Sequence, residues 1–256
     1  MPDYVNAHGL LEGKNVLITA AAGTGIGFAT AKRCIEEGAR VCISDIHERR
    51  LNESLDELEA LAGSKSPGFL ADVRSQDDVE RLISSAVDAL GSIDVLVNNA
   101  GLGGTANLVD MTDEQWDAVI DVTLGGTMRM TRAALAHMQP RGAGTIINNA
   151  SVVGWRAQAG QCHYAAAKAG VMALTRCSAI EAAPFGIRIN AVAPSLAMHP
   201  FLAKVTTEDL LAELTTREAF GRAAEPWEIA NVIVFLASDY SSYMTGEVLS
   251  VSSQHP

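Results

Sequence analysis

Tyr164 and Lys168 are the pair of side chains whose spacing points most directly to chemistry. They lie four residues apart in Tyr-Ala-Ala-Ala-Lys, a stretch of high helix propensity, so both fall on one face of a helix. A free tyrosine has a pKa near ~10, and a neighbouring ammonium lowers that pKa by favouring the phenolate. Ser151 follows an expected strand at 145–149, and its hydroxyl can bond the same substrate oxygen. We predict that Ser151, Tyr164 and Lys168 catalyse proton transfer at a carbonyl or alcohol oxygen. The alternative is an exposed tyrosine–lysine pair and an unrelated loop serine.

A loop of small residues lies where parallel α/β proteins bind phosphate. The strand expected at 15–19 runs into small residues at 20–27, and a helix is expected over 28–38. Small residues let the backbone approach a pyrophosphate, and the helix N-terminus offers free N–H groups. The pattern predicts a dinucleotide site that Gly25, Ile26 and Gly27 contact.

Asp45 ends the expected second strand, 18 residues after Gly27. A carboxylate there accepts hydrogen bonds from the adenosine ribose and repels a 2′-phosphate. The position therefore favours NAD over NADP as the cofactor, although Arg49 and Arg50 are near enough to reach a phosphate. Asp45 is equally suited to capping the helix that follows His47, and both roles are compatible.

These candidate residues need a parallel sheet to position them. Apolar runs too short for helices alternate with helix-like stretches, which is typical of a parallel sheet covered on both faces. The fold class expected is therefore a doubly wound α/β fold of three layers. A capping serine, Ser75, precedes an apolar helical stripe, Thr112–Gln115 forms a capping box, and Pro226 suits a first helical turn. The apolar runs lie at 15–19, 41–43, 93–97, 145–147, 187–192 and 248–251.

Composition narrows the class of protein further. The 256 residues are 48% hydrophobic and carry a net charge of −11, so we expect one globular domain over 1–256 that does not bind nucleic acid. No apolar run is long enough to span a membrane, and no basic, apolar leader opens the chain. Four cysteines without metal-ligand spacing predict no metal and a reducing compartment, so the expected location is the cytoplasm.

Taken together, these motifs resemble the short-chain dehydrogenase/reductase family over essentially the whole chain. The resemblance implies a Rossmann fold with a seven-stranded, mostly parallel sheet. It also implies that Asp72 and Val73 contact the adenine, that Asn99 lies along the cofactor, and that Lys168 binds the nicotinamide ribose beside Tyr164. Members are commonly homotetramers built on the helices that here carry 112–138 and 160–183. The motifs are the glycine loop, Asp72-Val73, Asn98-Asn99-Ala100-Gly101, Ser151…Tyr164-x-x-x-Lys168, 186–194 and 243–246.

The sequence departs from the family pattern at several positions. The first loop glycine is an alanine, and the loop is one residue longer than usual. Thr123 replaces an asparagine whose backbone carbonyl is thought to hold a proton-relay water, so its side chain has no assigned role. Ser195 follows Pro194 where glycine is usual, His199 replaces a threonine near the nicotinamide, and Ser252-Ser253-Gln254 replaces Asp-Gly-Gly.

Several of these departures occur together in a narrower actinobacterial subgroup that acts in steroid catabolism. The shared segments are 148–158, 163–182 and the ending Gln254-His255-Pro256. The resemblance implies an NAD-dependent oxidoreductase that interconverts a secondary alcohol and a ketone on a bicyclic, steroid-derived acyl-CoA. The alternative is a 3-oxoacyl-thioester reductase of fatty-acid metabolism. A third possibility, a non-catalytic nucleotide sensor on the same fold, would tolerate loss of Tyr164 or Lys168, yet both are present.

Several residues near the expected pocket have candidate roles. The irregular segment 196–224 is expected to cover the ligand crevice. Trp155 could pack on a fused-ring substrate and Arg156 could pair with a CoA phosphate, but ordinary loop packing explains both equally well. His163 points about 100° away from its neighbour Tyr164 on a helix and is expected to be structural.

Overall fold

A single sheet of seven strands organises the computed structural model, which describes residues 2–198 and 208–254. The strand order is β3-β2-β1-β4-β5-β6-β7, and every neighbouring pair is parallel. The strands are β1 (Asn15–Ile18), β2 (Arg40–Asp45), β3 (Gly68–Leu70), β4 (Val95–Asn98), β5 (Gly144–Asn149), β6 (Ile187–Pro194) and β7 (Val248–Val251).

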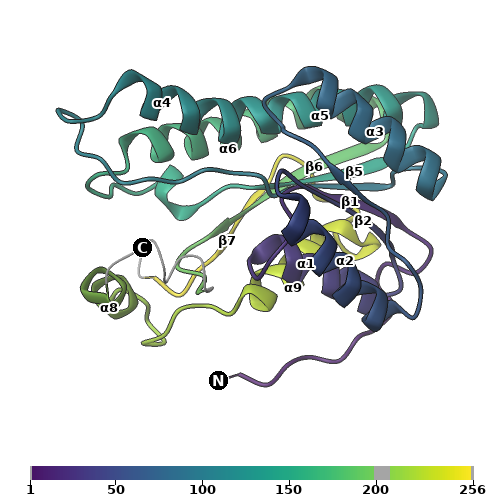
Figure 1. Ribbon diagram of the computed structural model, residues 1–256, viewed down its shortest axis with the longest axis horizontal. Helices are drawn as coiled ribbons and strands as arrows, with labels where there is room; N and C mark the ends of the chain where they lie inside the picture. Colours follow the sequence, from purple (N-terminus) through teal and green to yellow (C-terminus); the bar gives the residue numbers. More distant parts are fainter. Residues whose placement is uncertain (1, 199–207, 255–256) are drawn as a thin grey trace.

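Helices cover both faces of this sheet (Figure 1). One layer contains α1 (Ile26–Glu36), α2 (Glu48–Ala62) and α9 (Pro226–Ala237). The opposite layer contains α3 (Gln76–Leu90), α4 (Asp113–Ile120), α5 (Gly126–Met138) and α6 (Cys162–Ala182). A further helix, α8 (Glu208–Thr216), lies beyond the end of the sheet near the C-terminal tail. The predicted three-layer doubly wound Rossmann fold is confirmed.

The five inner strands are buried on both faces, as their apolar runs predict, whereas the edge strands β3 and β7 are partly exposed. Alternate residues point to opposite layers, so Leu17, Leu96 and Ile146 pack under α3 and α5, whereas Ile18 and Ile147 pack against α1 and α9. All five side chains are fully buried, and this double burial fixes the register of the central strands.

Local signals set the helix ends. The Ser75 hydroxyl accepts a hydrogen bond from the Asp78 N–H at 3.2 Å, which caps α3 as expected. Thr112 and Gln115 form the predicted reciprocal capping box of α4. The segment 112–138 is helical as expected, and a π-helical turn, Asp121–Gly125, lies between α4 and α5. Such a turn widens a helix locally and frequently marks a functional site.

The strand order places a ligand crevice between β1 and β4. The chain runs outward from β1 to β3 on one side and from β4 to β7 on the other, and ligands of open α/β sheets bind at the carboxyl ends of the strands where the order reverses. Within the described residues, every helix is too short or too polar to cross a lipid bilayer.

Candidate active site

The loop after β1 forms the floor of the crevice. Ala20 takes a left-handed φ of 49°, a conformation that costs a non-glycine residue roughly 1–2 kcal/mol. A Cβ atom at Gly27 would lie 2.7 Å from the Ala20 carbonyl oxygen and would also overlap the Asn99 amide, so only glycine fits there. By contrast, a Cβ at Gly25 would meet no protein atom within 4 Å. The loop therefore keeps open space at Gly25 and tight packing at Gly27.

Gly25 is also the N-cap of α1, and no side chain caps that helix. The backbone N–H groups of its first turn, at Ile26 and Gly27, therefore remain available to an anion, and the helix dipole favours negative charge there. This is the arrangement that holds a dinucleotide pyrophosphate, so the loop fits the predicted cofactor.

Asp45 lies at the carboxyl end of β2, and only 4% of its surface is exposed. One carboxylate oxygen accepts hydrogen bonds from the His47 N–H at 2.9 Å and from Arg50 at 3.2 Å. The other accepts from the Ala22 N–H at 3.4 Å. Asp45 thus joins the phosphate loop to the start of α2. The expected capping role is wrong, because His47 is the N-cap of α2 and no side chain caps that helix. The role of Asp45 at the ribose stays a prediction.

The adenine-side residues follow β3. The Asp72 carboxylate bonds the Arg74 guanidinium at 2.6–3.0 Å, and this partner lowers the pKa of Asp72. Val73 is buried against Gly126, where a Cβ would overlap the valine side chain. The adenine contacts predicted for Asp72 and Val73 remain predictions, but both residues lie at the carboxyl edge of the sheet.

Asn99 joins the two halves of the crevice. Its side-chain N–H₂ group donates to the carbonyl oxygens of Thr19 at 3.2 Å and Ala20 at 2.9 Å. Its side-chain oxygen accepts a hydrogen bond from the Asn149 amide at 3.0 Å, and the Asn149 carbonyl accepts one from the Lys168 ammonium. A continuous hydrogen-bonded chain therefore connects the phosphate loop to Lys168.

The three predicted catalytic residues lie together at the end of this chain. Ser151 lies two residues after β5 and is 8% exposed, and its hydroxyl acts on the Tyr164 phenol in the direction that lowers the pKa of the phenol. Tyr164 and Lys168 extend from α6, with the Lys168 Nζ 5.6 Å from the centre of the Tyr164 ring. Lys168 is 4% exposed. The sequence prediction that these side chains share one site agrees with this geometry.

The electrostatics of the site differ from the sequence expectation in one respect. Burial raises the pKa of Tyr164 to about 12, and the hydrogen bond to Ser151 offsets this effect only in part. Burial also lowers the pKa of Lys168 to about 8. The expectation of a Tyr164 pKa below its ordinary value is therefore wrong for this structure, because desolvation raises the pKa more than the Ser151 hydrogen bond lowers it.

The side chain of Thr123, which had no assigned role, has a structural one. It is fully buried in the π-helical turn, and its hydroxyl accepts from the Leu102 N–H at 3.0 Å and lies 3.2 Å from the Leu102 carbonyl. Its own carbonyl accepts a hydrogen bond from Thr127 at 2.7 Å. Thr123 thus holds the loop after β4 beside Lys168. The two neighbouring glycines at 125–126 are the sequence signal that could have predicted an irregular turn in this helix.

The remaining candidates separate into structural and surface residues. His163 is buried, as expected, and lines a pocket of about 360 Å³ with the loop 102–106. Trp155 is exposed, and Arg156 bonds the side chain of Gln254 rather than standing free. His199 lies outside the described residues. In the described part of the chain, no three His, Cys, Asp or Glu side chains cluster as metal ligands.

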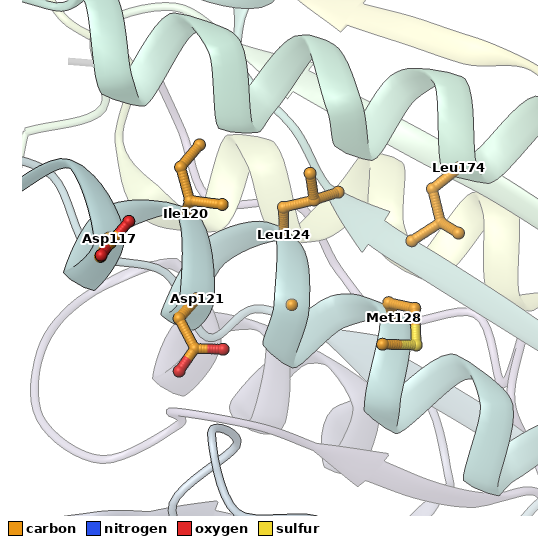
Figure 2. A pocket seen from close by; sticks show the side chains of 7 residues that line it. Asp117, Ile120, Asp121, Leu124, Met128 and Leu174 are labelled. Carbon is orange, nitrogen blue, oxygen red and sulfur yellow. The ribbon is translucent and has the colours of Figure 1, made fainter.

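A separate groove lies between the helices of one layer, away from the predicted catalytic side chains. Figure 2 shows Leu174 extending from α6 towards Leu124 and Met128, with Ile120 and Asp121 further along the same wall. The groove measures about 530 Å³, and most of its lining is apolar. It contains none of the predicted catalytic or cofactor residues.

The fold and site define a dinucleotide-binding oxidoreductase, and comparison with known proteins gives its family. A model of the family described as enoyl-(acyl carrier protein) reductase matches residues 20–253. The chain belongs to the short-chain dehydrogenase/reductase family. It is an enzyme of the kind that acts on CH–OH groups, and the fold implies a nicotinamide dinucleotide cofactor.

Individual relatives match this chain over nearly its whole length. It is 61% identical to the (5R,7aS)-5-hydroxy-7a-methyl-1-oxo-2,3,5,6,7,7a-hexahydro-1H-indene-carboxyl-CoA reductase of Mycobacterium tuberculosis, over 100% of this chain and 98% of that protein. It is 43% identical to a 3-oxoacyl-(acyl-carrier-protein) reductase of Thermotoga maritima, over 94% of this chain and 97% of the relative. A crystal structure of a short chain dehydrogenase from Mycobacterium smegmatis superposes with a TM-score of 0.89 at 58% identity, covering 100% and 98% of the two chains.

Proposed function

We propose that this enzyme interconverts a secondary alcohol and a ketone on a bicyclic, steroid-derived acyl-CoA with NAD as cofactor. The observation that carries the proposal is the meeting of Ser151, Tyr164 and Lys168 at the crevice edge, in a chain 61% identical throughout to a reductase of such a substrate. When bound, the nicotinamide supplies or accepts the hydride. The protein supplies position and the proton.

Gly25, Ile26 and Gly27 would hold the pyrophosphate, and Asp45 the adenosine ribose. Asp72, Val73 and Asn99 would line the rest of the cofactor path, and Lys168 and Tyr164 would meet the nicotinamide ribose. These assignments are supported by the free N–H groups of α1, the buried carboxylate at the end of β2, and the hydrogen-bonded chain from the phosphate loop to Lys168.

In the ketone-reducing direction, Tyr164 donates its phenolic proton to the substrate oxygen while the Ser151 hydroxyl orients that oxygen. A phenol whose pKa is about 12 remains protonated at neutral pH, which is the form needed for this step. In the oxidative direction the same oxygen of Tyr164 receives the proton from the alcohol. The Lys168 ammonium stabilises the phenolate from which the oxidative step begins and in which the reductive step ends.

The test is a comparison of substrates with purified enzyme, following NADH at 340 nm. We expect a kcat/KM for the hydrindanone carboxyl-CoA ester at least tenfold above that for acetoacetyl-CoA. The reverse order would favour the second candidate, a 3-oxoacyl-thioester reductase, which the 43% identical relative supports. Bound NADH without turnover of any alcohol, ketone or CoA ester would favour a nucleotide sensor instead.

Three further features belong to this proposal. The groove between α4, α5 and α6, together with exposed Ile180 on α6, supports a homotetramer built on these helices. Light scattering that gives the mass of a monomer would contradict it. The free cysteines suit the reducing cytoplasm, which is the proposed location. The segment 196–224 is proposed to cover the substrate, and residues 199–207 of it lie outside the described residues.

A further inference from the structure

Glu218 is a buried glutamate that the catalytic account does not use. It lies two residues beyond α8, is 4% exposed, and receives four hydrogen bonds. One carboxylate oxygen accepts from the Leu196 N–H at 3.3 Å and the Gln254 amide at 3.1 Å. The other accepts from the hydroxyls of Ser195 at 3.1 Å and Ser253 at 2.8 Å. Among the described residues no cation lies within 4 Å of this carboxylate, so its burial depends on these donors.

The donors come from two segments that the sheet brings together. Ser195 follows β6, whereas Ser253 and Gln254 follow β7, and β6 and β7 are parallel neighbours. Their carboxyl ends share the edge of the sheet at which Ser151 follows β5. The Ala219 N–H also bonds the Ser253 carbonyl at 2.7 Å. The backbone next to Glu218 is therefore bonded directly to the segment that follows β7. The network therefore flanks the catalytic site.

Glu218 determines which way the Gln254 amide faces. A carboxylate only accepts hydrogen bonds, so Gln254 must turn its N–H₂ group towards Glu218 and its carbonyl oxygen away. That oxygen accepts a hydrogen bond from the Arg156 guanidinium at 2.5 Å. The result is a directed relay from Glu218 through Gln254 to Arg156.

Arg156 belongs to the same short turn as the catalytic serine. The Arg156 N–H bonds the Val152 carbonyl at 3.0 Å, and the Ser151 hydroxyl accepts from the Val153 N–H at 3.3 Å. Arg156 has no carboxylate partner within 4 Å in the part of the chain that the structure describes, in a protein of net charge −11. Only one of its five N–H donors is used by Gln254. The guanidinium therefore keeps donors for oxygen atoms of a ligand.

We infer that Glu218 is a positioning residue for substrate binding, which acts through Gln254 to hold the Arg156 guanidinium against oxygen atoms of the acyl-CoA. The inference rests on the proposed function, and it connects three departures from the family pattern, at Ser195, Ser253 and Gln254, through one carboxylate.

The test uses steady-state kinetics of the full chain with the CoA ester that the wild type turns over. A hydrogen bond to a charged group contributes about 1.5–3 kcal/mol, so Glu218→Ala, Gln254→Ala and Arg156→Ala should each raise KM about 10- to 100-fold. We expect kcat and the Kd for NADH to change less than about threefold on the same reasoning, because the relay does not contact the predicted cofactor residues. The double variant Arg156→Ala/Gln254→Ala should have the same KM as Arg156→Ala alone, because Gln254 acts through Arg156.

Two controls separate positioning from folding. Glu213→Ala removes an exposed glutamate of α8 and should leave KM unchanged. Glu218→Gln should retain most of the wild-type KM, because its amide oxygen can accept from Leu196 and Gln254 while its N–H₂ group donates to the two serine hydroxyls. If Glu218→Ala does not fold, Gln254→Ala still tests the relay, since it leaves three bonds to Glu218 intact.

The outcomes are distinguishable. A KM within twofold of wild type for both Gln254→Ala and Arg156→Ala would overturn the inference and leave the proposed function standing. Absence of wild-type turnover with any CoA ester would contradict both the inference and the proposed function. Repeating the assay with the N-acetylcysteamine thioester, which lacks phosphates, identifies the substrate oxygen that Arg156 contacts. If the variants no longer raise KM with this substrate, the contact is a CoA phosphate. If they still raise KM, the contact is the acyl group or the thioester.

Discussion

The cofactor side and the substrate side of this crevice are built by different means. On the cofactor side, between β1 and β4, the main determinants are backbone features: the left-handed Ala20, the close packing at Gly27 and the uncapped start of α1. On the substrate side, beyond β5, side chains from distant parts of the sequence determine the geometry, as the Arg156–Gln254–Glu218 relay illustrates. A cofactor shared by many enzymes suits a fixed backbone cradle, whereas individual substrates require side chains that vary.

The largest expected effect lies where the two sides meet. Tyr164→Phe removes the proton donor and should lower kcat by about 10²–10⁴-fold. NADH binding should change less than threefold, because the phenol oxygen is one of many predicted contacts. Steady-state assays with fluorescence titration of NADH check both quantities. A variant that keeps more than a tenth of wild-type turnover would exclude Tyr164 as the proton donor.

The cofactor side makes a prediction with a matched pair of variants. Gly27→Ala forces a Cβ to within 2.7 Å of the Ala20 carbonyl, so it should lower the melting temperature by several degrees and weaken NADH binding at least tenfold. Gly25→Ala meets no protein atom within 4 Å and should leave the melting temperature within about 1–2 °C. Equal melting temperatures for the two variants would contradict the packing described for Gly27.

The pH dependence of stability tests the electrostatics of the junction. Burial lowers the Lys168 pKa from 10.5 to about 8, so between these values the unfolded chain binds more protons than the folded one. The contribution of Lys168 to stability must therefore rise with pH from about 8 to about 10.5. Relative to Lys168→Met, the wild type should gain about 2 kcal/mol between pH 8 and pH 10, measured by urea unfolding. A constant difference would mean that the ammonium is not desolvated.

Cofactor choice gives the smallest expected effect. Asp45→Ala removes the carboxylate that would bind the ribose and repel a 2′-phosphate, so the ratio of NADPH to NADH affinity should rise about tenfold. Asp45 also holds the start of α2, so the melting temperature of Asp45→Ala is measured beside the ratio to separate the loss of the ribose contact from a loss of folding. An unaltered ratio in Asp45→Ala would place the ribose elsewhere.

The contrast between the two sides also explains what the sequence could predict. Short-range patterns determine the strands, the capped helices, the glycine loop and the spacing of Tyr164 and Lys168, so these features were predictable. The π-helical turn at Thr123 and the raised pKa of Tyr164 depend on packing from several elements, which no local pattern encodes. Glu218 could not be found in advance, because its donors lie 22 to 36 residues away in the sequence.

The most direct test of the central claim is transfer of label from the cofactor. NADH that carries deuterium at the transferable position of C4 is incubated with the enzyme and the hydrindanone carboxyl-CoA ester, and the product is examined by mass spectrometry. The account predicts deuterium on the new carbinol carbon with the wild type and almost none with Tyr164→Phe. Tight NADH binding with no labelled alcohol formed by the wild type would contradict it.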